Sequence, residues 1–184
     1  MSTATETTAV TTLPRTKPLP LDRYNFRILK GEAKRSQLKA DGKGNNRYIN
    51  FQVEIYNPET IRHNSDGVVY NIAGLKSNLM LMIETPADLT AAEKFMALLG
   101  MSGKLDQDNP DIESFVGKTY SNKAGAKQYE LRKDPTFEQL QADPNAKGDV
   151  FVNPETGQPE VGYSIDCGFC LRDVYKATAP SISA

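Results

Sequence analysis

The chain has 184 residues, of which 39% are hydrophobic and 24% are charged, and its net charge is −1. This composition is typical of a globular protein, and the length favours one domain with short additions. No apolar run reaches the roughly 18–20 residues of a membrane-spanning helix, and the first twelve residues lack the basic start and apolar block of a signal peptide. We therefore expect a cytoplasmic protein that does not contact membranes.

The near-neutral total conceals an uneven distribution of charge. Ten basic and three acidic residues lie between Arg15 and Arg47, so this segment carries +7 whereas the rest of the chain carries −8. Phosphate groups respond to such a local potential, because salt screens charges over about 10 Å. The segment predicts a surface that binds a polyanion, although a solvated basic face without a ligand has the same pattern.

The two ends of the chain read as irregular. A Thr-rich start is followed by three prolines without any apolar period, and the last residues are small and polar. We expect residues 1–20 to form a flexible arm, residues 21–176 a single domain, and residues 177–184 a disordered tail. Residues 134–160 are expected to form a polar insert within the domain.

An antiparallel hairpin is expected at the start of the domain. Tyr24, Phe26 and Ile28 alternate with polar residues, and residues 49–55 show the clearest alternation in the chain. A period of two is typical of strands with one buried face. The segment 39–46 between them contains Gly and Asn and predicts the connecting loop.

A strand and a helix are predicted next. Val68–Ile72 is expected to be a third strand, whereas Leu79–Ile83 is apolar and fits a strand or a helix. A helix is predicted from Thr85, a suitable N-cap that precedes a proline, to Gly100. Apolar side chains at helical spacing should pack this helix into the core: Leu89, Ala92, Phe95, Met96 and Leu99.

A second basic hairpin is expected after this helix. Residues 115–120 and 128–132 are predicted to be its strands, joined by a loop at 121–126. Between Gly117 and Lys133 five basic residues and one acidic residue give a net charge of +4. Residues 161–174 are predicted to be the last strand.

These elements fit a mainly β fold of the oligonucleotide-binding (OB) type, a five-stranded antiparallel barrel with one helix between strands 3 and 4. Nucleic acid crosses such a barrel between the loops that join strands 1 and 2 and strands 4 and 5, where the two basic hairpins fall. Tyr48 alternates with the expected core residue Phe51, so it faces outward and offers a ring for base stacking, although such tyrosines also occur as barrel-edge residues. The predicted DNA-binding residues are Arg27, Lys30, Lys34, Arg35, Lys39, Lys43, Arg47, Tyr48, Lys118, Tyr120, Lys123, Lys127, Tyr129 and Arg132.

Motifs for catalysis or metal binding are weak. Cys167 and Cys170 have a C-x-x-C spacing, but they lie in the last predicted strand without a second ligand pair, so we interpret them as packed thiols. His63 is the single histidine and is expected on the surface of a polar loop. The acidic residues between 106 and 113 lack the spacing of an EF-hand. We predict neither an enzyme nor a cofactor or metal site.

Several segments resemble bacteriophage-encoded single-stranded DNA-binding proteins. Tyr24-Asn-Phe-Arg-Ile, Gly31-Glu-Ala-Lys-Arg-Ser and Asn45-Asn-Arg-Tyr-Ile-Asn-Phe-Gln-Val-Glu-Ile are similar to the opening of those proteins, and Gly117-Lys-Thr-Tyr to a later part. The resemblance implies an OB fold and a role in phage DNA replication, recombination or repair in the cytoplasm of a bacterial host. It leaves open a homo-oligomer and contacts with phage or host replication and recombination proteins. The uncharged end of this chain differs from the acidic, partner-recruiting tails of many cellular single-strand binders.

The leading hypothesis is non-catalytic binding of single-stranded DNA through basic loops and stacking tyrosines. The alternative is a virion or assembly protein that uses a small β-barrel for protein–protein contacts, which the Thr/Pro-rich arm would suit equally well. A thiol oxidoreductase that uses Cys167 and Cys170 is a third and weaker hypothesis.

Overall fold

The computed structural model describes residues 10–14, 17–38, 42–128, 163–166 and 174–176. Within these ranges strands dominate, with one α-helix and one turn of 3₁₀ helix, η1. In chain order the elements are β1 (Asp22–Arg35), β2 (Arg47–Asn57), β3 (Thr60–Arg62), β4 (Val69–Asn71), β5 (Lys76–Met82), α1 (Pro86–Leu98), η1 (Glu113–Phe115), β6 (Thr119–Gln128), β7 (Tyr163–Asp166) and β8 (Val174–Lys176).

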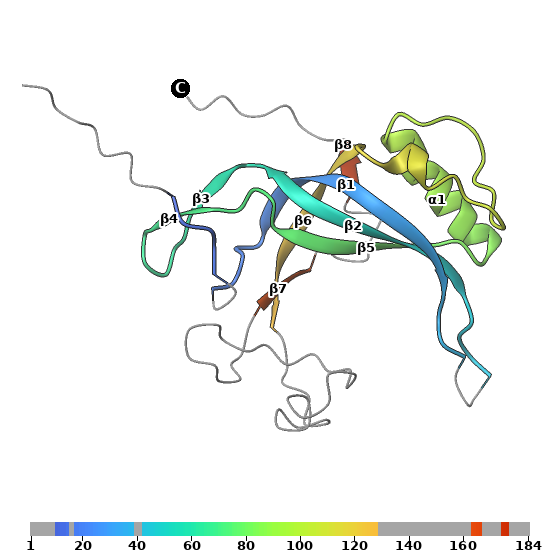
Figure 1. The fold of residues 1–184 in the computed structure, drawn as a ribbon, viewed down its shortest axis with the longest axis horizontal. Helices are drawn as coiled ribbons and strands as arrows, with labels where there is room; N and C mark the ends of the chain where they lie inside the picture. The colour runs from blue at the N-terminus through green and yellow to red at the C-terminus, as the bar shows by residue number, and fades with distance from the viewer. Residues whose placement is uncertain (1–9, 15–16, 39–41, 129–162, 167–173, 177–184) are drawn as a thin grey trace, which may run out of the picture.

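Most strands form one curled antiparallel sheet. Its order is β5-β2-β1-β6-β7, with β8 also paired to β6, whereas β3 and β4 form a separate two-stranded hairpin. Figure 1 shows the sheet curling like half a barrel, with α1 near one end and the β3–β4 hairpin at the other. The mainly β fold with a single α-helix is therefore confirmed for the described part of the chain.

The alternation in β2 decides how the sheet is buried. Ile49, Phe51, Val53 and Ile55 are fully buried, and the residues between them are half-buried on the opposite face. A strand whose side chains alternate in this way places one row in the core and one row outside. The predicted hairpin of β1 and β2 and the core position of Phe51 are confirmed.

Gly31 allows two elements to approach β1 closely. It pairs with Phe51 across the β1–β2 ladder. A Cβ atom at this position would lie 2.7 Å from Cγ2 of Ile112 and 2.7 Å from the ring of Phe51. The absence of a side chain therefore lets the Phe51 ring and the segment before η1 pack against the strand. The register of the β1–β2 ladder shifts between Ile28 and Lys30, just before this glycine.

The predicted helix is confirmed as α1. The Thr85 hydroxyl accepts a hydrogen bond from the Asp88 backbone N–H, and the Asp88 carboxylate accepts one from the Thr85 N–H. This reciprocal capping box satisfies N–H groups that have no partner inside the helix. The predicted apolar stripe buries Ala92, Phe95 and Met96 against the sheet.

The second predicted hairpin is wrong. The segment expected to be its loop, residues 121–126, lies inside the long strand β6. The first part of β6 pairs with β1, from Arg27 opposite Thr119 to Asp22 opposite Ala124. Cross-strand pairing therefore overrides the turn-forming tendency of Ser, Asn and Gly in this segment.

The closed five-stranded barrel is also not what the described residues form. β5 and β7 approach each other at the two ends of the sheet order, but no hydrogen-bonded ladder joins them in the described part. The helix follows the fifth strand along the chain rather than the third, because β3 and β4 are inserted after β2. The predicted last strand, residues 161–174, covers β7 and only the first residue of β8, and the residues between these two short strands lie outside the described ranges.

The segment before β1 is attached to the β3–β4 hairpin. Leu13 and Leu19 are buried in the core. A parallel bridge pairs Thr12 with Asn71, and the Leu13 N–H donates a hydrogen bond to the Asn71 carbonyl at 2.9 Å. The expectation of a flexible arm is therefore wrong for its described residues.

His63 helps to hold this segment in place. The histidine is only 5% exposed, so its predicted surface position is wrong. Its Nε2 lies 2.9 Å from the Pro18 carbonyl oxygen, and its Nδ1 lies 3.2 Å from the Ser65 backbone nitrogen. A carbonyl accepts and an amide donates, so Nε2 carries the proton and Nδ1 is the acceptor.

Neither α1 nor any other helix in the described ranges has the length and apolar character needed to cross a membrane.

Candidate nucleic-acid interface

Three neighbouring strands present one continuous outer surface, which we call the β1–β2–β5 surface. Its β2 residues alternate with the buried row and are half-buried, and its β1 residues are exposed. The ladders place β2 between β1 and β5, so residues of all three strands lie side by side. The surface comprises Lys30, Glu32, Lys34, Tyr48, Asn50, Gln52, Asn78, Met80 and Met82.

A row across these strands combines a cation, an aromatic ring and a thioether. Tyr48 is the ladder partner of Lys34 on one side and of Met82 on the other. The Lys34 ammonium lies 2.9 Å from the Glu32 carboxylate. This carboxylate, first by its hydrogen bond and then by its charge, raises the pKa of Lys34, and the nearby Tyr48 adds a smaller effect in the same direction. Lys34 is therefore charged at neutral pH, next to a ring on which a base can stack.

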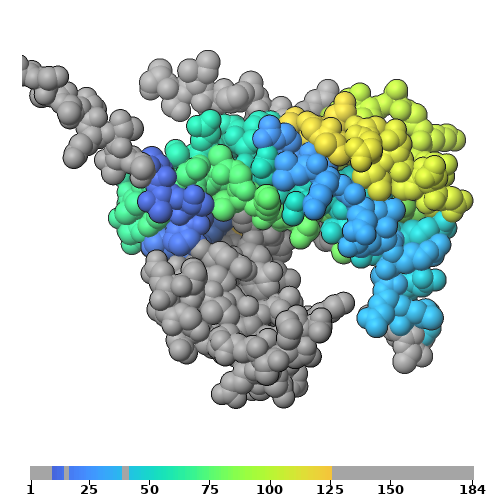
Figure 2. Space-filling model, viewed as in Figure 1, coloured from blue at the N-terminus to red at the C-terminus, as the bar shows by residue number. Residues whose placement is uncertain are grey.

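The β1–β2 hairpin carries this surface away from the body of the protein. Figure 2 shows the ends of β1 and β2, in blue and cyan, projecting beyond the rest of the sheet. The tip is closed by a backbone hydrogen bond from Ser36 N–H to the Asn46 carbonyl and by one from Asn46 N–H to the Ser36 hydroxyl, both at 2.9 Å. Leu38, 64% exposed, and Lys43 lie at this tip.

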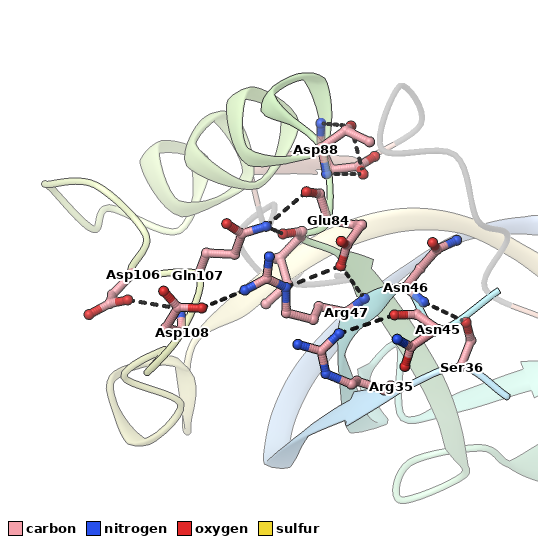
Figure 3. A network of polar contacts seen from close by, with 12 residues as sticks. Arg35, Ser36, Asn45, Asn46, Arg47, Glu84, Asp88, Asp106, Gln107 and Asp108 are labelled. Atoms are coloured by element: carbon pink, nitrogen blue, oxygen red, sulfur yellow. Dashed lines mark hydrogen bonds and ion pairs between the residues drawn. The ribbon is translucent and has the colours of Figure 1, made fainter. Parts of the chain in front are cut away.

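Arg27 and Arg47 are already paired with carboxylates. Arg27 Nε donates to Oε1 of Glu54 at 3.0 Å. Arg47 Nε donates to Oε2 of Glu84 at 3.1 Å, and Arg47 Nη1 donates to Oδ1 of Asp108. Figure 3 shows the Arg47 guanidinium between these two acids. The positive charge of both arginines is therefore partly neutralised by acids far away in the sequence.

Glu84 binds both the backbone and the side chain of Arg47. The same Oε2 atom also accepts a hydrogen bond from the Arg47 backbone N–H at 2.8 Å. These backbone and side-chain hydrogen bonds lower the pKa of Glu84 below its usual value. The ion pair therefore persists at neutral pH and orients the guanidinium.

The candidate residues around β6 do not form the expected second loop. Tyr120 is fully buried, stacked on Phe26 with 5.6 Å between ring centroids and edge-on to Phe95 at 5.5 Å. Its predicted role in stacking on DNA is therefore wrong, because β6 continues as a strand and turns this ring into the core. Lys123 is exposed and stands opposite Arg23 in the β1–β6 ladder.

The other members of this group are distributed differently. Lys118 is half-buried and lines a cleft of about 320 Å³ together with Lys104, Asp106 and Asp111. Lys127 belongs to β6, and its backbone pairs with Ser164. Three further candidates lie outside the described residues: Lys39, Tyr129 and Arg132.

A smaller cleft of about 190 Å³ lies at the base of the hairpin loop, beside Arg35 and Arg47, the last ladder pair before that loop. One wall comes from the ends of β1 and β2, and the other comes from the segment after α1. The side chains that matter for its chemistry are Lys34, Arg35, Arg47, Tyr48, Gln107 and Asp108.

The contribution of β5 and of the segment 106–110 was not predicted from the sequence. Met80 and Met82 alternate with buried Leu79 and Leu81, so a strand assignment for this segment would have placed them outside. No local pattern marks Asp108, which is 61 residues from its partner Arg47.

Cys167 and Cys170 lie outside the described residues. Within the described part, His, Cys, Asp and Glu side chains form no group of three or more that could hold a metal ion. Comparison with protein-family models, curated proteins and solved structures gives no match.

Proposed function

We propose that the protein binds single-stranded DNA without catalysis, on the β1–β2–β5 surface and along the projecting hairpin. The observation that carries this proposal is the row in which Tyr48 stands between Lys34 and Met82. A base can stack on the tyrosine ring while the lysine neutralises the adjoining phosphate. A duplex keeps the faces of its bases inside the stack, so this surface favours a single strand.

The connectivity of the larger sheet supports an OB-type interpretation. When β3 and β4 are left out, α1 stands between the third and fourth strands of this sheet along the chain. Strands 2 and 3 of an OB fold carry the binding surface, and they correspond to β2 and β5 here. Together with the resemblance to phage single-stranded DNA-binding proteins, this favours a role in phage DNA replication or recombination.

The first test is a titration of a labelled single strand of about 30 nucleotides, followed by fluorescence anisotropy at about 50 and 200 mM salt. We expect tight, salt-sensitive binding that an unlabelled duplex does not compete away, and an RNA strand of the same sequence tests the preference for DNA. Binding no tighter than about 10⁻⁴ M would overturn the proposal, because this is the weak end of non-specific affinity. That result would favour the alternative of a protein partner, for which the exposed Leu38 of the hairpin tip offers an apolar contact.

Tyr48→Ala tests the stacking contact. The loss of one stacked base costs about 1–3 kcal/mol, so the Kd for the single strand should rise about 5- to 150-fold. Tyr56→Ala is the matched control, because Tyr56 is a half-buried tyrosine at the other end of the same strand. Equal effects of the two substitutions would contradict a specific role for Tyr48.

A further inference from the structure

The cleft at the base of the hairpin loop has a wall opposite the strands that hydrogen bonds hold in place. Gln107 Nε2 donates hydrogen bonds to the carbonyl oxygens of Ile83 and Glu84, at 2.7 and 2.8 Å. Asp106 Oδ1 accepts hydrogen bonds from the backbone N–H groups of Asp108 and Asn109, at 2.9 and 3.1 Å. Figure 3 shows this segment facing Arg47, the first residue of β2. The position of Asp108 is therefore set by the backbone around it.

Basic residues make up a large part of the lining of this cleft. They are Lys34, Arg35 and Arg47, and Asp108 is the one acid among the lining residues in the described part of the chain. Arg35 Nη1 donates to the Asn45 carbonyl at 3.2 Å, which orients its guanidinium at the hairpin. The residues that line the cleft therefore carry more positive than negative charge and supply several N–H donors, a combination that suits a phosphate group.

The two acids that contact Arg47 are not equivalent. Glu84 is 30% exposed and binds both the backbone and the side chain of Arg47, whereas Asp108 is 86% exposed and binds only Nη1. An exposed ion pair contributes little in water, because solvent and salt screen both charges. Asp108 is therefore the partner that an incoming anion can replace, while Glu84 keeps the guanidinium oriented.

We propose that this cleft is a phosphate subsite of the single-stranded DNA surface, and that Asp108 occupies Arg47 until a backbone phosphate takes its place. The proposal rests on the proposed function, and it names the residues that would receive one phosphate next to a base stacked on Tyr48. The exchange leaves the Arg47–Glu84 contact in place. Part of the free energy of DNA binding therefore depends on the displacement of the Asp108 carboxylate from Arg47.

Asp108→Asn tests this exchange, with Glu59→Gln as the matched control. Glu59 is an exposed carboxylate in the turn between β2 and β3, so its replacement changes the net charge equally without touching the cleft. At about 50 mM salt we expect the Kd of Asp108→Asn for the single strand to fall by up to about five-fold, the upper end of the range of an exposed ion pair, and that of Glu59→Gln to fall much less. Equal effects of the two variants overturn the proposal.

A double-mutant cycle tests whether the gain in affinity of Asp108→Asn requires Arg47. In an Arg47→Gln background, Asp108→Asn should give no more than the Glu59→Gln effect, because no guanidinium remains to be released. The Arg47 Nε–H resonance should shift when the single strand is added to the wild-type protein. If inorganic phosphate at millimolar concentration shifts it equally, the subsite takes any phosphate rather than a DNA phosphodiester, and this overturns the DNA assignment. Binding of the single strand with an unchanged Arg47 resonance overturns the subsite alone, whereas no binding overturns the proposed function as well.

Discussion

At the scale of single residues, charges that look uniform in the sequence have different environments. Arg27 and Arg47 are each held by carboxylates, whereas Lys30 is exposed and has no ion pair within the described part of the chain. A side chain that is already paired must exchange its partner before it binds phosphate. The segment charge of +7 therefore overstates the number of cations that are immediately available.

Lys17 and Asp66 form a small clasp between the arm and the β3–β4 hairpin. Their charged atoms are 2.7 Å apart, and the Tyr70 hydroxyl donates to the same Asp66 carboxylate at 2.8 Å. The Lys17 hydrogen bond, the Val68 N–H and the Tyr70 hydroxyl lower the pKa of Asp66 well below its usual range, while the hydrogen bond to Asp66 raises the pKa of Lys17. The clasp therefore joins two groups that are both charged at neutral pH.

These shifts determine the pH window of the clasp. The contribution of Asp66 is complete above the ordinary aspartate pKa of about 4 and is lost as the pH falls through the lowered folded value. The contribution of Lys17 is complete below about 10.5 and is lost as the pH rises through the raised value. The protection of the Leu13 amide against hydrogen exchange should therefore stay constant between about pH 4 and about pH 10.5. It should fall in Asp66→Asn. Unchanged protection in that variant, with Glu59→Gln as control, would show that the clasp does not hold the arm.

At the scale of elements, the β1–β2 hairpin depends on a tight turn as well as on its ladder. Gly44 has a φ of 101°, and a Cβ atom there would lie 2.2 Å from the Gln37 carbonyl oxygen. No L-residue fits without displacing this backbone. The tip that presents Leu38 and Lys43 therefore relies on one glycine.

Gly44→Ala should loosen the hairpin tip without unfolding the protein. Gly42→Ala is the matched control, because Gly42 also has a positive φ, 76°, but a Cβ atom there meets nothing within 4 Å. Strain of about 1–3 kcal/mol is expected at Gly44 in excess of the control. It should appear as faster amide exchange at Ser36 and Asn46 and as weaker binding of the single strand, with similar melting temperatures. A large drop in melting temperature for Gly44→Ala alone would mean that the tip is part of the cooperative core.

At the scale of the whole molecule, local patterns predicted the elements whose signals are local. The alternation of β2 and the capping box of α1 lie within a few neighbouring residues, and both elements appear where expected. β6 was missed because its Ser, Asn and Gly residues resemble a turn until β1 and β7 pair with them. Tyr120 was placed outside because a shift of one residue in a strand exchanges its two faces.

The candidate site was only partly predictable for the same reason. Tyr48, Lys34 and Arg35 follow from the alternation and the loop of one hairpin, and the structure places them together. The partners of Arg47 lie 37 and 61 residues away, so only the folded chain shows that a strand end and the segment after α1 meet around it. Long-range charge pairing has no sequence period.

The salt dependence of binding tests how these charges act together. Each phosphate contact on a single strand contributes about 0.7 to the slope of log K against log salt. Lys30→Gln with Lys34→Gln should therefore reduce the slope by about 1.4 if each lysine neutralises one phosphate. Arg62→Gln with Lys94→Gln, on β3 and α1, removes the same charge from elements outside the β1–β2–β5 surface and should leave the slope nearly unchanged. Equal slopes for the two double variants would mean that net charge alone attracts the strand, because the position of the cations would then not matter.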